Sequence, residues 1–296
     1  MSELTSKELN HLCQVATKAA MEAGEYIQSM FDKHYVTQSK QGGDSLASQV
    51  VTEVDIKAQE IILSHLNPTI SDHDLGLLTE ELTDDHSRHT KDYFWCIDPM
   101  DGTLPFTEHR TGYAVSIALI SRSGDPVIGV VYIPDLGECY KAVKGGGVFL
   151  NESAFDRTRV PADQKLHFYM DISFQTESYY SRVKDSLTDW ANENKYAELI
   201  IHAEYGGVRN AIGVLSSKHG CYFKFPKQAN GCGSIWDYAA TRLFFEELGL
   251  IVSNANGQRL NLNLPETTFL NGEGIFYATS LGVADMIIDF GKSKNF

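Results

Sequence analysis

Basic side chains are scarce in this chain of 296 residues. It has 25 lysines and arginines against 39 aspartates and glutamates, so its formal net charge at neutral pH is -14. A chain with this excess of negative charge does not attract nucleic-acid polymers or anionic membranes through its overall field. An anionic ligand therefore needs a local inversion of the field, which divalent cations held by clustered carboxylates would provide.

Long hydrophobic runs and paired cysteines are also missing. No apolar stretch approaches the length of a membrane-spanning helix, and the N-terminus lacks the basic and then apolar order of a signal peptide. The five cysteines are far apart and never form a C-x-x-C pair, and the ten histidines show no metal-ligand spacing. We therefore expect a cytoplasmic protein with no membrane partner, and the sequence assigns no role to any histidine.

The first half of the chain predicts helices followed by a mainly antiparallel sheet. Thr5 and Glu8 form a capping-box pattern that opens a helix running to Met30. Thr52 caps a second helix that Pro68 is expected to end, and the Gly-rich and Ser-rich residues 38–49 are expected to form a mobile loop. Apolar runs predict strands at 77–79, 94–97, 114–120, 127–133 and 139–143. The last three of these are expected to form an antiparallel meander.

The second half alternates strand and helix patterns, which is typical of an α/β unit. Strands are predicted at 166–172, 199–203, 221–225 and 250–252, and helices at 177–193, after Gly207 and at 236–248. Hydrophobic residues make up 43% of the chain, which is enough for one large core or two modest ones. We expect an α+β metal-binding domain over residues 1–155 and an α/β substrate domain over 156–296, with the active site in the crevice between them.

The sharpest local signal is the hexapeptide from Asp98 to Thr103, which directly follows the predicted strand 94–97. Two aspartates three residues apart, Asp98 and Asp101, can converge on one cation. Gly102 and Thr103 can begin a helix whose free backbone NH groups face an anion. The alternative is a Pro-Asp-Gly turn whose acids are simply solvated.

Three further acids are weaker candidates when each is taken alone. Glu80 ends the predicted strand 77–79, and its hard oxygen ligands suit Mg²⁺ rather than Zn²⁺, although paired glutamates are usually surface charge. Asp237 and Asp55 lie in the first turns of predicted helices. There an acid can simply complement the helix dipole or close a capping box.

The chain resembles the lithium-sensitive, magnesium-dependent phosphatases that include inositol monophosphatase and 3'(2'),5'-bisphosphate nucleotidase. The resemblance covers nearly the whole chain and rests on four motifs in family order, 51–55, 79–81, 95–103 and 236–240. It implies a layered αβαβα fold of the sugar-phosphatase type, two or three Mg²⁺ ions, and hydrolysis of a small phosphate monoester. A non-catalytic metal-binding or phosphate-binding regulator is the alternative, disfavoured because Thr103 and Glu80 are both present.

The resemblance also implies a role for each motif residue. The first metal would be held by Glu80, Asp98 and the Met100 carbonyl, and the second by Asp98, Asp101 and Asp237. Asp55 would help to hold a third, weaker metal beside Glu80, while Thr103 and Glu80 orient the attacking water. Substrate contacts would come from Asp101, Gly102, Thr103, Gly207, Arg209, Asn230 and Asp237.

Departures from the family pattern bear on the substrate. Asn230 stands near where inositol monophosphatases usually place a glutamate that accepts bonds from ring hydroxyls, and residues 206–210 and 268–271 are more similar to the bisphosphate nucleotidases. Arg209 would meet a second phosphate, unless it is a solvated surface residue. We therefore expect a 3'(2'),5'-bisphosphate nucleotide as substrate, with inositol 1-phosphate as the main alternative and fructose 1,6-bisphosphate as a weaker one. The oligomeric state stays open, with a homodimer as one alternative.

Overall fold

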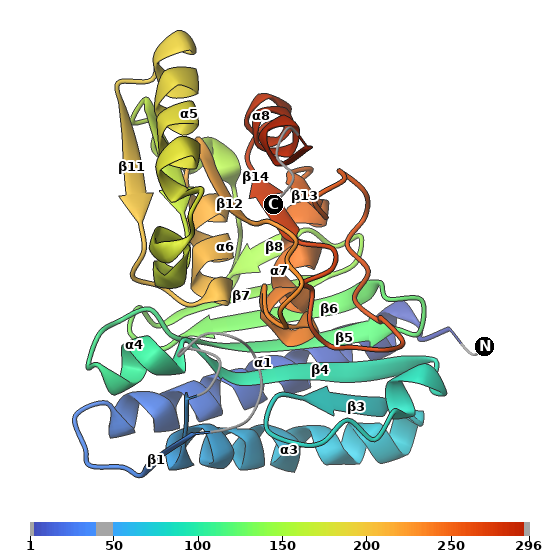
Figure 1. Cartoon of the computed structure of the whole chain (residues 1–296). Helices are drawn as coiled ribbons and strands as arrows, with labels where there is room; N and C mark the ends of the chain where they lie inside the picture. Colours follow the sequence, from blue (N-terminus) through green and yellow to red (C-terminus); the bar gives the residue numbers. More distant parts are fainter. Residues whose placement is uncertain (1–2, 40–49, 293–296) are drawn as a thin grey trace.

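The computed structural model describes residues 3–39 and 50–292 and has five layers in the order αβαβα (Figure 1). Helices α1 (Ser6–Met30) and α3 (Glu53–His73) cover the outer face of a seven-stranded sheet. Helices α6 (Gly207–Ser216) and α7 (Ile235–Glu247) lie between that sheet and a five-stranded one, whose outer face packs on α5 (Tyr180–Glu193) and α8 (Leu281–Lys292). The predicted layered fold is confirmed.

The seven-stranded sheet is mainly antiparallel and follows chain order. Only β3 and β4 pair in parallel, and the remaining neighbours are antiparallel. Its strands are β3 (Gly76–Thr79), β4 (Tyr93–Asp101), β5 (Ala114–Ser121), β6 (Pro126–Ile133), β7 (Glu138–Val143), β8 (Val148–Leu150) and β9 (Ser153–Ala154).

The five-stranded sheet has the order β11-β10-β12-β14-β13. Strand β10 runs parallel to β11 and β12, whereas β14 is antiparallel to β12 and β13. Their bounds are β10 (Lys165–Tyr169), β11 (Glu198–His202), β12 (Gly220–Lys224), β13 (Ile251–Ser253) and β14 (Ile275–Ala278). The carboxyl ends of β10 and β12 therefore lie side by side, which is where open α/β sheets place their ligands.

Side-chain alternation along the strands explains why helices cover both faces of each sheet. In β4, Phe94 and Cys96 face the central helices, whereas Trp95 and Ile97 pack in the outer core with α1 and α3. The five-stranded sheet alternates in the same way, with tyrosines inside and phenylalanines outside. Tyr169, Tyr222 and Tyr277 face α6 and α7, and Phe168, Phe223 and Phe276 face α5 and α8.

Several details differ from the sequence predictions. Pro68 does not end the second helix, which continues to His73. Pro68 has no backbone NH, so the carbonyl of Ser64 loses its helical hydrogen bond, but both residues are exposed to solvent. At the next residue, Thr69 Oγ1 accepts a hydrogen bond of 2.9 Å from the Trp95 indole. The predicted strand 166–172 ends at Tyr169, and its last residue begins the 3₁₀ turn η3 (Ile172–Thr176).

The remaining differences concern the predicted loop and elements that the sequence did not predict. Of the loop predicted over 38–49, residues 40–49 lie outside the described residues, while 38 and 39 belong to β1 (Thr37–Ser39), which pairs with β2 (Val50–Thr52). Strand β14 and helix α8 were not predicted. Two further 3₁₀ turns are η1 (Ser87–His89) and η2 (Arg157–Arg159). Among the described residues, none of the helices is both long and apolar enough to cross a lipid bilayer.

Candidate metal centre

A bulge at the end of β4 brings Asp98 and Asp101 together. Asp98 pairs with Ser116 and Asp101 with Ala114, so β4 has one more residue than β5 between these two pairs. Residues three apart on a regular strand point to opposite faces, and the extra residue removes that alternation. Carboxylate oxygens of Asp98, Asp101 and Asp237 consequently lie within 4.8 Å of one another. The convergence predicted for the two aspartates is present.

Asp101 also joins the two halves of the chain. Its Oδ1 and Oδ2 accept hydrogen bonds from the backbone NH groups of Gly207 and Val208, each 2.9 Å long, at the start of α6. A Cβ on Gly206 would lie 2.4 Å from Asp101 Oδ2, so the close approach requires glycine there. Gly207 was predicted to contact the substrate, and in the structure its backbone NH is bonded to Asp101.

Asp55 and Thr103 connect α3 to the turn that follows β4. Asp55 Oδ2 accepts from the Thr52 NH and hydroxyl, both at 2.7 Å, which is the capping box considered as its simplest role. Its Oδ1 accepts from the Thr103 hydroxyl at 2.9 Å, while the Met100 carbonyl lies 3.1 Å from the same hydroxyl. Asp55 is therefore a helix cap that is also bonded to the candidate phosphate-binding turn.

Gly102 gives that turn its shape. It has a φ of +85°, and a Cβ at this position would lie 2.6 Å from the Gly112 carbonyl oxygen. It caps α4 (Thr103–Thr107), so the predicted helix start at Gly102 and Thr103 is confirmed. Both requirements, the left-handed backbone and the close approach, exclude any other residue without strain.

Glu80 completes the carboxylate cluster from the loop that follows β3. Its NH donates to the Ile97 carbonyl across the β3–β4 pair at 3.1 Å. Its side chain is hydrogen bonded to Asp98, and its charge acts on Asp237 and Asp55. The acids of the four motifs are therefore connected to one another, three of them directly in the cluster and Glu80 and Asp55 through hydrogen bonds and charge.

Electrostatics show that these acids fit a cation. Burial, and then repulsion from Glu80, Asp101 and Asp237, raise the pKa of Asp98 well above its ordinary value. Burial and the charge of Asp237 similarly raise the pKa of Asp101. Burial is also the largest cause that raises the pKa of Asp237 and of Asp55 to about 6. Buried carboxylates that repel one another need protons or a cation, and an all-oxygen set suits Mg²⁺.

The predicted substrate residues differ in their settings. Arg209 is buried, with Nη1 2.6 Å from Asp135 Oδ1 and the guanidinium over the Tyr205 ring, so it is not the solvated surface residue considered as its alternative. Asn230 is exposed on the loop between β12 and α7. Contacts of either residue with a substrate stay predictions.

Sequence reasoning missed a charged pair beside the carboxylates. Lys224, at the carboxyl end of β12, forms a salt bridge with Asp171, which follows β10. Tyr222 donates to the same aspartate at 3.0 Å. Burial opposes the charge on the lysine, but Asp171 holds the pKa of Lys224 well above its usual value, so the amine is charged. Its charge lowers the pKa of Asp101 and Asp237, which places it near the candidate site.

Comparisons with known proteins agree with this geometry. The model of the family described as "Inositol monophosphatase family" matches residues 8–286. The chain is 26% identical to the 3'(2'),5'-bisphosphate nucleotidase CysQ of Aggregatibacter actinomycetemcomitans, over 88% of this chain and 90% of that protein. It is 27% identical to inositol monophosphatase 2 of Solanum lycopersicum, over 86% and 91%. The fold matches an IMPase/NADP phosphatase solved with Mg²⁺ and phosphate, at a TM-score of 0.71, 18% identity and 97% coverage of both chains.

Removal of one shared charge tests whether the cluster is a metal centre. We expect Asp98→Asn to lower phosphate release by about two orders of magnitude or more. Its melting temperature in EDTA should equal or exceed that of the wild type, because a source of repulsion is gone. Added Mg²⁺ should then stabilise the wild type more than the variant. Asp189→Asn, on the exposed face of α5, is the matched control. A variant that is unfolded in every buffer would show that Asp98 has only a structural role.

The raised pKa values predict how the metal-free protein responds to pH. For an acid with a pKa raised to about 6 on folding, the unfolded chain loses its proton first, so stability falls as pH rises from about 4 to 6. For Asp55 the loss is on the order of 3 kcal/mol. Urea unfolding in EDTA should show this decline, and Mg²⁺ should reduce it. Identical pH profiles with and without Mg²⁺ would contradict the assignment.

Proposed function

The chain belongs to the inositol monophosphatase family of metal-dependent phosphomonoesterases, and we propose that it uses Mg²⁺ to remove one phosphate from a small molecule that carries a second one. The favoured substrates are 3'(2'),5'-bisphosphate nucleotides. The observation that carries the phosphatase assignment is the cluster of Asp98, Asp101 and Asp237, buried or half-buried, with Glu80 beside it.

We propose that two ions bind at this cluster, the first to Glu80, Asp98 and the Met100 carbonyl, and the second to Asp98, Asp101 and Asp237. A third, weaker ion would involve Asp55. Bound Mg²⁺ supplies positive charge against the phosphoryl oxygens and lowers the pKa of water. The Thr103 hydroxyl has a single hydrogen, which Asp55 or the Met100 carbonyl accepts, so its oxygen is left to accept a hydrogen bond from the attacking water.

Lys224 supports a substrate with a second anionic group. An ammonium group beside Asp237 is suited to a phosphate, whereas a carboxylate there would suit the hydroxyl groups of a sugar. The lysine is partly neutralised by Asp171, but Asp171 also fixes its direction at the edge of the two parallel strands. The relationship to CysQ over most of the chain supports the same substrate class.

Inositol 1-phosphate is the second candidate, since a tomato inositol monophosphatase is equally similar to this chain. Fructose 1,6-bisphosphate is a weaker third. The proposed compartment is the cytoplasm, which fits five cysteines without a disulfide between them.

Direct comparison of substrates tests the proposal. With Mg²⁺, we expect kcat/KM for adenosine 3',5'-bisphosphate to exceed that for inositol 1-phosphate by about tenfold or more, because inositol 1-phosphate has no second phosphate for Lys224 to bind. We expect fructose 1,6-bisphosphate, which has a second phosphate but no resemblance to the substrate of CysQ, to be the weaker of the two bisphosphates. Phosphate release measured in parallel gives the ranking, and EDTA should abolish it for every substrate. A ranking led by inositol 1-phosphate would establish the alternative, and full turnover in EDTA would refute metal dependence.

Substitution of Lys224 separates recognition from chemistry. Lys224→Gln should raise KM for the bisphosphate by about tenfold and change kcat little, while inositol 1-phosphate kinetics stay nearly constant. Lys224→Arg keeps the charge and should recover most of the affinity. Lys144→Gln, which removes one positive charge from an exposed turn, controls for the overall field. Equal KM changes for both substrates would mean that Lys224 does not face the second phosphate.

A further inference from the structure

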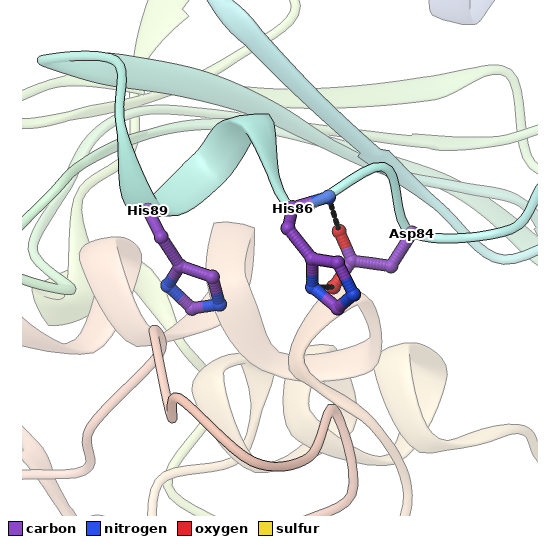
Figure 2. Close-up of side chains that lie close together, drawn as sticks. All are labelled: Asp84, His86 and His89. Carbon is purple, nitrogen blue, oxygen red and sulfur yellow. Dashed lines mark hydrogen bonds and ion pairs between the residues drawn. The ribbon is translucent and has the colours of Figure 1, made fainter.

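A carboxylate and two imidazoles meet on the connection between β3 and β4, outside the cluster described above (Figure 2). One ligand atom from each of Asp84, His86 and His89 lies within 4.8 Å of the other two. The two rings lie side by side on the same turn, with centroids 6.0 Å apart and planes 19° from parallel. His86 Nδ1 is 3.6 Å from Asp84 Oδ2. All three side chains therefore face one small volume.

His89 provides a second, independent observation. Its Nε2 atom is buried and has no hydrogen-bond partner in the structure. A buried polar atom without a partner loses its bonds to water and gains nothing in return. Imidazole binds metals through a nitrogen atom that carries no hydrogen. A metal bond to Nε2 would supply the missing partner.

The surroundings hold the carboxylate in place. Asp84 Oδ1 accepts from the His86 backbone NH at 2.8 Å, and Oδ2 accepts from Arg88 Nε at 2.7 Å. Arg88 is itself buried, and its Nη1 donates to Asn263 Oδ1 and the Leu264 carbonyl on a second loop. Carboxylates that bind metals are usually oriented by such partners. The positive charge of Arg88 repels a cation at this position. The negative charge of Glu266, which also acts on His89, counteracts that repulsion.

We propose that Asp84, His86 and His89 form a second metal site, selective for Zn²⁺ and separate from the magnesium centre. Two imidazoles and one carboxylate are a donor set for zinc, whereas magnesium takes oxygen ligands almost exclusively. Tetrahedral zinc with bonds of about 2.0 to 2.1 Å needs ligand atoms about 3.3 Å apart, so the separations must shorten by at most roughly 1.5 Å. The His86 side chain is 73% exposed and has room to make that movement. Water would take the fourth position.

The position of this site gives it a structural role. The turn η1 lies between Glu80, which follows β3, and strand β4, which ends in Asp98 and Asp101. A bound ion would cross-link the two ends of the turn and reduce the motion of residues 80–92. The zinc site would therefore stabilise the segment that positions Glu80 without taking part in the reaction.

Zinc binding to the whole protein tests this. Calorimetric titration with Zn²⁺, in buffer containing millimolar Mg²⁺ to fill the carboxylate cluster, should give one zinc site per chain. His86→Ala and His89→Ala should each weaken it by about tenfold or more, while the basal Mg²⁺-dependent activity stays unchanged. His11→Ala, at an exposed position on α1, is the matched control and should bind as the wild type does. Asp98→Asn should retain the zinc site, because it alters only the magnesium centre.

Hydrogen exchange gives a readout that is independent of activity. Zinc should slow amide exchange in residues 80–92 of the wild type and of His11→Ala, but not of His89→Ala. The proposal is overturned if the wild type takes up no zinc in the presence of Mg²⁺. It is equally overturned if Asp98→Asn abolishes zinc binding, or if the His86 and His89 variants bind zinc as tightly as the control.

Discussion

The structure depends on holding several carboxylates together in a place from which water is largely excluded. Like charges at this distance repel, and three helix N-termini partly compensate them. Asp55 accepts from the Thr52 NH at the start of α3, Asp101 from the first amides of α6, and Asp237 from the Ser234 NH that precedes α7. Each helix points the positive end of its dipole at the cluster. The directions of α3, α6 and α7 are thus tied to the electrostatic requirement of the site.

This requirement also links the two sheets. Asp98 and Asp101 belong to the seven-stranded sheet, while Asp237 lies on a helix of the central layer, whose core reaches both sheets. The cluster can form only when that shared core is packed. In the absence of a cation, the raised pKa values of Asp98 and Asp101 mean that repulsion within the cluster reduces the free energy of unfolding once the acids are ionised. A metal therefore acts on the stability of the same contacts that unite the two halves.

The sequence was sufficient for elements with strong local signals and insufficient where distant segments meet. The helix from Ser6 to Met30 and the acids of the hexapeptide follow from capping and motif patterns within a few residues. The bulge in β4 could not be predicted, because it depends on the register with β5. Lys224 and Asp171 lie 53 residues apart and meet only because β10 and β12 are parallel neighbours. His86 and His89 have no spacing that the sequence analysis identified with a metal site, so their approach to Asp84 was not predicted.

Charge balance explains why residues at the edge of the site can decide the substrate. Glu80, Asp98, Asp101 and Asp237 together carry about four negative charges when ionised, which two divalent ions, the number proposed above, would cancel. The ions would still contact the reacting phosphate directly, so it is a second anionic group, farther from them, that would be attracted mainly by the positive ends of local dipoles and by any further cation. Among the described residues, Lys224 is the charged amine whose field reaches both Asp101 and Asp237. Because Asp171 neutralises part of that charge, the role proposed for the lysine is to distinguish an anionic from a neutral group elsewhere on the substrate, rather than to attract the reacting phosphate.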